Sequence, residues 1–311
     1  MIANGITGEA ARLMEKARDV QGRSLWTDAW RRLLRNRAAV VSMVILAIIA
    51  LMAIAAPLLS QYAYNDQDYS HITCSPNWWS VDGACNAGGT HWFGTDLVGR
   101  DLFVRVLYGA RVSLAVGLVA TLVSLFIGVT YGAIAGFVGG RVDELMMRFV
   151  DVLYSLPFIF FVIILMVVFH RNFYLLFIAI GAIEWLTMAR IVRGQALSIK
   201  QKEFIEAARA GGVGPVGIIF RHVVPNVLGP VVVYVTLTIP AVILAESFLS
   251  FLGLGIQEPL TSWGVLIAEG KDQMENYPWM LLFPTAFMAV TLFCFNFIGD
   301  GLRDALDPKD R

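Results

Sequence analysis

The sequence predicts an all-α integral membrane protein with six transmembrane helices. Of its 311 residues, 57% are hydrophobic and only 15% are charged. The mean hydropathy is +0.66, so the chain carries more apolar surface than one soluble core can bury. Six stretches reach the roughly 20 apolar residues that a helix needs to cross a bilayer. They cover residues 38–58, 112–138, 150–169, 173–189, 227–249 and 279–298.

Composition argues against several classes of function. Lys and Arg together number 24, as do Asp and Glu, so there is no net basic field to hold nucleic acid. The three cysteines form no CxxC or Cys/His cluster, which argues against a metal site. No G-x-x-x-x-G-K-[ST] phosphate loop occurs, and the glycine-rich stretch 211–217 contains no lysine. We therefore expect no catalytic residues, no metal and no cofactor in this chain, and no enzymatic activity.

The positions of the basic residues predict the orientation. With the N-terminus inside, 19 of the 24 Lys and Arg residues fall on the inner side and 5 on the outer side. Both termini are therefore expected in the cytoplasm. The expected segments are an inner tail, a first span, an outer loop, a core of five spans with an inner loop over 190–226, and a second inner tail. Their bounds are 1–37, 38–58, 59–111, 112–302 and 303–311.

The first span is expected to remain as an anchor. Ala53-Ile54-Ala55 imitates a signal-peptide cleavage site, but the leader is long and partly acidic and the apolar core has span length. Before this span, an amphipathic segment predicts a helix that lies along the inner leaflet. An ordinary positive flank would explain its arginines equally well, but its two tryptophans favour the interfacial helix. The apolar and cationic residues are Trp26, Trp30, Leu33, Leu34, Arg31, Arg32, Arg35 and Arg37.

Small residues in the second span predict tight helix packing. Glycine recurs there at every fourth position, which removes side chains from one helix face and lets another backbone approach closely. We interpret this row as packing and not as ligand binding. Its members are Gly128, Gly132, Gly136 and Gly140.

The inner loop predicts a helix-turn-helix. Ser198 and Gln201 match a capping box. A charged helix follows to Ala210, and Gly211-Gly212 supply its stop. A second short helix is expected to begin at Pro215 and to be closed by Pro225, so it covers 215–225.

At this loop the chain resembles a known family. Glu206-Ala207-Ala208, then Gly212, then Pro225 resembles the EAA loop of ABC-importer membrane subunits, whose pattern is EAA, three residues, G, nine residues, I-x-L-P. The glycine and proline spacings match. His222 and Val224 stand where the family most often has isoleucine and leucine.

Further stretches resemble the peptide/nickel family of these subunits, and within it the oligopeptide members. The similarity runs from about Gly22 to Arg311. The stretches that carry it are HWFGTDLVGRDLFVRVLYGARVSL from His91, ESFLSFLGLGIQEPLTSWG from Glu246, FNFIGDGLRDALDPKDR from Phe295, GRSLW from Gly22 and NRAAV from Asn36.

The resemblance implies a type I ABC-importer permease fold in a bacterial inner membrane, with an interfacial helix and a cytoplasmic coupling helix. It implies a heterodimer with a homologous permease subunit, two cytoplasmic ATPase subunits that bind ATP and Mg, an extracytoplasmic peptide-binding protein, and a peptide substrate. This chain would form half of the translocation pathway. The residues expected to couple it to the ATPases are Glu206, Ala207, Ala208, Arg209, Gly212 and Pro225.

Two carboxylates inside predicted spans require an explanation, because inserting each of them into a bilayer costs roughly 2.5 to 3.5 kcal/mol. Glu246 belongs to a family-like stretch near the outer mouth, where it would support a gate or attract a peptide amino terminus, or simply bond a neighbouring helix. Glu184 would line the pathway or snorkel inward. Asp151 and Pro157 are interpreted as structural.

Other classes of protein remain open at this stage. A dipeptide or metal-chelate importer permease shares several of these motifs. A secondary transporter would predict repeated halves and helices broken at the midplane, and the sequence has no convincing repeat. A membrane-anchored receptor would need a soluble domain of about 100 residues, and no segment has that length.

The outer loop contains a candidate disulfide. Cys74 and Cys85 both fall in it, and exposed free thiols outside the cell are selected against by their reactivity. Cys294 lies in the last span and is expected to be a free, buried thiol.

Overall fold

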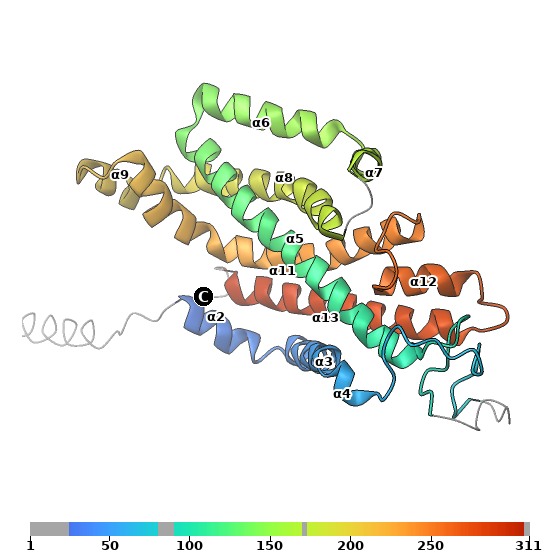
Figure 1. Ribbon diagram of the computed structural model, residues 1–311. Coiled ribbons are helices and arrows are strands. Elements are labelled where there is room, and N and C mark those ends of the chain that lie inside the picture. The colour runs from blue at the N-terminus through green and yellow to red at the C-terminus, as the bar shows by residue number, and fades with distance from the viewer. Residues whose placement is uncertain (1–24, 80–89, 170–172, 308–311) are drawn as a thin grey trace, which may run out of the picture.

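The computed structural model describes residues 25–79, 90–169 and 173–307, and these are all-helical apart from loops and one isolated bridge between Thr95 and Asp101. Figure 1 shows the arrangement. The helices are α2 Leu25–Leu33, α3 Arg37–Ile54, α4 Ala56–Leu59, α5 Leu102–Val138, α6 Gly140–Ser155, α7 Phe158–Val168, α8 Phe173–Ile199, α9 Glu203–Ala210, α10 Pro215–Ile218, the π-helix Ile219–Val223, α11 Val224–Phe251, α12 Trp263–Lys271 and α13 Trp279–Leu306.

The long helix α5 runs through the middle of the bundle. α8 and α11 pack against it, α13 packs on α11, and α3 packs on α13. α9, α2 and the C-terminal end of α13 lie at one end of the molecule, while α12 and residues 90–101 lie at the other (Figure 1). Asp101 starts α5, because its Oδ2 accepts a hydrogen bond from the N–H of Val104 at 3.0 Å.

Four helices in the described part of the chain are long and apolar enough to cross a membrane, or five if one bent pair counts as a single span. The predicted total of six is therefore not confirmed. The predicted span over 150–169 is bent, since α6 and the helix that follows it meet at 81°. The break lies at Pro157, which has no N–H to donate and disfavours helical backbone at Leu156.

Ion pairs hold α6 on α8. Arg193 donates to both carboxylate oxygens of Asp143, at 2.5 and 2.6 Å. Arg190 donates to Asp151 at 2.8 Å and lies over the ring of Tyr154. Asp151 therefore has the structural role that the sequence predicted for it.

The glycine row of α5 faces α8. A Cβ added at Gly128 would lie 2.6 Å from Met188, and one at Gly136 would lie 2.6 Å from the carbonyl oxygen of Arg193. One at Gly132 would collide with the carbonyl oxygen of Ala189. These three glycines confirm the predicted close approach of two backbones.

Gly140 does not belong to this row. It has φ +59°, and nothing lies within 4 Å of a Cβ built there. The reason is that α5 ends at Val138, so Gly140 opens α6 and leaves the α5–α8 contact. The sequence predicts that Val129, beside Gly128 in α5, faces lipid, but the structure buries it at 7% exposed.

The segment before the first span forms the short helix α2. Its Ala29 and Leu33 are buried against α13, whereas Trp26 and Trp30 are 48% and 56% exposed. Leu33 therefore belongs to the interior and not to the lipid-facing side. The exposed tryptophans favour a helix that lies along the membrane surface, and this orientation of α2 stays a prediction.

Candidate functional site

The inner loop ends its first helix, α9, in a Schellman motif. The N–H of Gly212 donates to the carbonyl of Arg209 at 3.0 Å, and that of Val213 donates to Ala208 at 3.1 Å. The motif needs left-handed backbone, and φ at Gly212 is +81°. A Cβ built there meets nothing within 4 Å. Glycine is therefore required by the backbone conformation and not by space, and the predicted end of the helix is confirmed.

The start of α9 differs from the prediction. Ser198 lies inside α8, and the N-cap of α9 is Lys202, which makes no side-chain cap bond. The predicted capping box of Ser198 and Gln201 is therefore wrong. Packing overrides the local signal, because Ala196 in the last turns of α8 is fully buried.

Pro225 does not close the second helix, which is a further correction. α10 begins with Pro215 as predicted, but it continues through the π-helix into α11. The N–H of Val224 bonds the carbonyl of Ile219, five residues earlier. This wider turn makes room for the ring of Pro225, which an α-helical interior would not accept. The loop is thus continuous with the span that follows.

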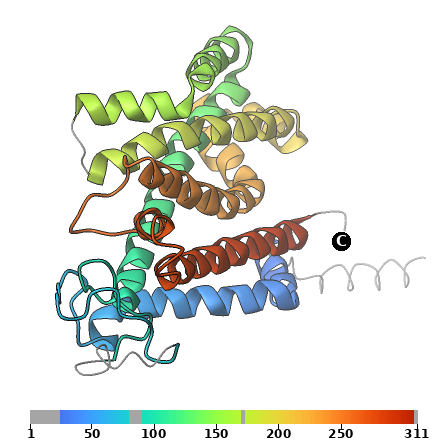
Figure 2. The same cartoon turned by 90° about the vertical axis from the view of Figure 1, so that its right-hand side faces the viewer.

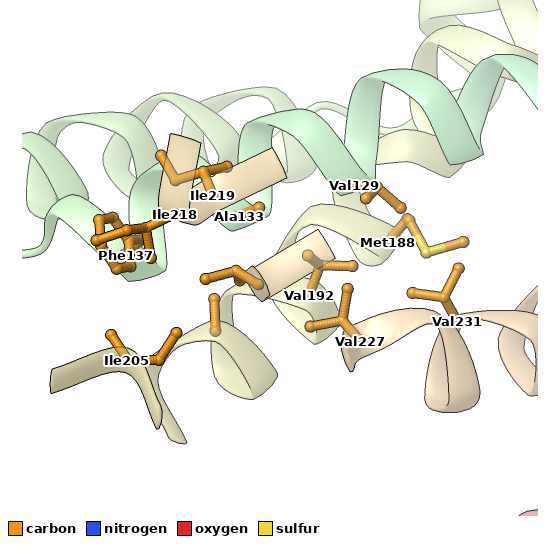
Figure 3. Close-up of a cluster of buried hydrophobic side chains, with 12 residues drawn as sticks. Val129, Ala133, Phe137, Met188, Val192, Ile205, Ile218, Ile219, Val227 and Val231 are labelled. Atoms are coloured by element: carbon orange, nitrogen blue, oxygen red, sulfur yellow. The ribbon is translucent and has the colours of Figure 1, made fainter. Parts of the chain in front are cut away.

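A buried cluster joins the loop to the spans (Figure 3). Ile205 of α9, Ile218 at the end of α10 and Ile219 in the π-helix are each at most 4% exposed. They pack in one cluster with Phe137 at the end of α5, and the guanidinium of Arg209 lies 5.3 Å from the centre of that ring. Burying one such aliphatic side chain contributes about 1.5–3 kcal/mol. The loop is therefore fixed to the ends of α5 and α11.

The loop also has exposed side chains of mixed chemistry. Phe204, Val216 and Phe220 are 43%, 68% and 55% exposed, and Glu206 is exposed as well. Large apolar side chains at an exposed surface are typical of a protein docking site. The other predicted coupling residues are exposed or half-buried, namely Ala207, Ala208, Arg209, Gly212 and Pro225.

The two carboxylates within spans have different surroundings. Glu246 is fully buried, and its Oε1 accepts hydrogen bonds from the hydroxyls of Ser250 and Ser262, each at 2.7 Å. These contacts tie α11 to the start of α12 and fit the structural alternative. Glu184 is half-buried on α8 and interacts with Tyr234 of α11. The structure therefore does not bring the two carboxylates into one site.

Sequence reasoning missed an ion network at the end of the molecule where α12 and residues 90–101 lie (Figure 1), which we call the rim network. Asp96 is 1% exposed and accepts from Arg100 at 2.6 Å and from Arg105 at 2.5 Å. Arg105 also bonds Glu269 of α12 at 2.9 Å, and Arg100 bonds Glu258 at 2.7 Å. Burial lowers the pKa of Arg100, but its bonds to Glu258 and Asp96 outweigh this and raise the pKa.

The rim network fastens the outer loop to α5 and α12. Its three central residues, Asp96, Arg100 and Arg105, all lie in the family-like stretch that begins at His91, and this stretch is the signal in the sequence that points to them. Their acidic partners lie 158 and 164 residues further along the chain. No local pattern could pair groups so far apart.

Local polar contacts order the rest of the outer loop. The hydroxyl of Ser70 and then the imidazole of His71 hydrogen-bond to Asp68 and lower the pKa of its carboxyl to about 2. His91 is buried and lies 3.0 Å from Asp101, the residue that caps α5. The loop is therefore tied directly to the start of α5.

The predicted disulfide lies partly outside the described residues. Cys74 is buried and disulfide-bonded, whereas Cys85 lies in the undescribed stretch, so their pairing stays a prediction. Cys294 is a free, buried thiol.

We expect mass spectrometry of protein alkylated without reduction to label neither Cys74 nor Cys85. After reduction and unfolding, both should carry the alkyl group. In the chain-entropy model, a disulfide that closes so short a loop stabilises it by roughly 2 to 3 kcal/mol. Alkylation of both residues before reduction would disprove the bridge.

The fold and the loop together define a multi-pass helical membrane protein with a packed helical loop at one end. Residues 128–311 match the family described as "Binding-protein-dependent transport system inner membrane component", and residues 24–76 match the "N-terminal TM domain of oligopeptide transport permease C". The chain belongs to this family of inner-membrane transport components.

Curated relatives agree over nearly the whole length. The chain is 59% identical over 293 residues to the oligopeptide transport system permease protein OppC of Escherichia coli K12, covering 94% of each chain. It is 43% identical over 304 residues to OppC of Bacillus subtilis 168, covering 98% of this chain and 94% of that one. It is 45% identical over 285 residues to DppC, a dipeptide transport permease of the same bacterium, covering 91% and 86%.

A solved structure supports the fold. An inward-facing structure of the MetNI methionine ABC transporter matches with a TM-score of 0.53 at 20% identity, covering 66% of this chain and 96% of that chain. The similarity confirms the predicted type I ABC-importer permease architecture.

Proposed function

We propose that this chain forms half of the translocation pathway of an ATP-driven oligopeptide importer. Relatives at 59% identity are named oligopeptide permeases, and a dipeptide permease matches at 45%, which favours oligopeptides over dipeptides or metal chelates. The proposed partners are a homologous second permease subunit, two cytoplasmic ATPase subunits and an extracytoplasmic binding protein. ATP and Mg²⁺ bind to the ATPase subunits.

The single observation that carries the coupling role is the two-sided inner loop. Its buried residues are packed against α5 and α11, and its exposed residues include Glu206, Phe204, Val216 and Phe220. A displacement of the loop would be transmitted to α5 and α11, because the loop is packed against α5 and is continuous in helix with α11. ATP-driven closure of the ATPase pair would thus rock α11 and α5 between inward and outward openings.

The proposed orientation places both termini in the cytoplasm. The inner loop, α2 and the C-terminal end of α13 share one end of the molecule (Figure 1), and this arrangement agrees with the distribution of Lys and Arg. Within the membrane, Glu184 is the stronger candidate for the pathway, because it is half-buried whereas Glu246 has no exposed surface.

ATP-dependent peptide uptake by the complete transporter, reconstituted in vesicles, tests the proposal. We expect uptake only when the ATPase subunits are present. A secondary transporter would take up peptide without them, and this outcome would overturn the proposal.

Gly212→Ile should reduce uptake at least tenfold. A β-branched residue at φ +81° costs roughly 1–3 kcal/mol of backbone strain, so the loop should rearrange at the end of α9. Peptide uptake and ATPase co-purification measure the effect.

Gly214→Ile is the matched control. Gly214 is also exposed with nothing within 4 Å of a built Cβ, but its φ is −66°. Asparagine tolerates left-handed backbone, so Gly212→Asn should retain most of the peptide uptake. Normal uptake and ATPase recruitment in Gly212→Ile would refute the coupling role of this turn.

A further inference from the structure

An apolar groove lies between the first and last long helices. α3 and α13 run side by side (Figure 2) and line an open groove of about 450 Å³. This volume is within the range of natural ligand sites, roughly 300–1,000 Å³. Its walls are mostly aliphatic and aromatic, including Val41, Ile45, Val290, Phe293 and Phe297. Such a lining suits a hydrocarbon chain and offers little to a polar solute.

One end of the groove carries a fixed positive charge. Among the described residues that line the groove, Arg37, at the start of α3, is the only charged one, and it is exposed. No salt bridge of Arg37 occurs within the described part of the chain. The helix end itself is already satisfied, because Asn36 Oδ1 accepts the N–H groups of Ala38 and Ala39 at 3.1 and 3.2 Å. The guanidinium is therefore the group available to an anion.

The neighbouring helix marks the level of the membrane surface. In α2 and the turn after it, Trp30 and Leu34 are 56% and 49% exposed, and Arg31 and Arg35 are exposed beside them. Tryptophan and arginine together are typical of the boundary between hydrocarbon and headgroups. We therefore expect Arg37 at headgroup level, with the groove extending into the hydrocarbon.

We propose that this groove binds one anionic phospholipid, with an acyl chain between α3 and α13 and its phosphate on Arg37. Charge complementarity selects this occupant. A transmembrane helix of a second subunit could fill the apolar walls, but it would leave Arg37 without an anion unless it also supplied an acid. A lipid supplies hydrocarbon and anion in one molecule.

The test uses the complete transporter in vesicles with spin-labelled phosphatidylglycerol or phosphatidylcholine as the probe. We expect the wild type to retain the anionic probe preferentially, and Arg37→Gln to lower this preference about fivefold, the effect of one basic residue at a membrane surface. Val41→Trp, which fills the groove, should reduce retention of the anionic probe as well.

Matched controls separate the site from general surface charge. Arg141→Gln removes an exposed arginine on α6, across the molecule from α3, and Leu51→Trp enlarges an exposed residue of α3 outside the groove. Both should behave as wild type. An unchanged preference in Arg37→Gln, or an equal loss in Arg141→Gln, would overturn the proposal. The proposal would also be overturned if Val41→Cys cross-linked to the second membrane subunit in the assembled transporter and no lipid were bound there.

Discussion

Asp96→Ala should lower the free energy of unfolding of the outer region by about 3–5 kcal/mol, the cost of breaking a buried ion pair from one side. Asp96 accepts from the side chains of Arg100 and Arg105 and from the backbone N–H groups of Val98 and Arg100. Its removal leaves Arg105, whose side chain is 2% exposed, with Glu269 alone. The melting temperature in detergent and the rate of proteolysis of the outer loop measure the effect.

Asp272→Ala is the control for this change. Asp272 also lies on the outer side, but it is exposed and its nearest cation, Lys271, is 3.9 Å away, so its loss should change stability by less than about 1 kcal/mol. Asp96→Asn should fall between the two, since an amide oxygen still accepts the backbone N–H groups. Equal stability of Asp96→Ala and Asp272→Ala would show that the rim network does not hold the loop.

Gly132→Leu should reduce the yield of folded protein severely, with a loss of roughly 3 kcal/mol or more in stability. Even one methyl group at Gly132 would collide with the carbonyl oxygen of Ala189 and approach Val192 Cβ to 2.9 Å. Backbone cannot move aside as a side chain can, so α5 and α8 would have to separate along their contact. Size-exclusion profiles and melting temperatures in detergent report the result.

Gly194→Leu provides the comparison on the facing helix. Gly194 is exposed on α8, and a Cβ built there meets nothing within 4 Å of this chain. The same substitution should therefore be tolerated, and Gly→Ala there should even favour the helix by up to about 1 kcal/mol. If both leucine variants fold equally well, the glycine row is not a packing surface.

Local rules predicted much of the candidate site because its key feature is a backbone conformation. A glycine that ends a helix favours left-handed φ, and Gly212 has it. The same rules failed at Ser198 and Pro225. At Ser198, burial of the last turns of α8 outweighs a capping signal, and at Pro225 a π turn accommodates the ring inside a continuous helix. Both outcomes depend on neighbours that are distant in the chain.

By itself, the sequence determined that the chain lies in a lipid bilayer, its helical class, the position of the helical loop after α8, and the family. Apolar run length, glycine and proline chemistry and motif spacing are local properties. Tertiary structure decided which glycines touch α8, how Asp96 finds Glu269 through Arg105, and where Arg37 meets an apolar groove. These features join segments that are separated by many residues. Their energies come from packing and from the pairing of buried charges, which exist only once the helices are assembled.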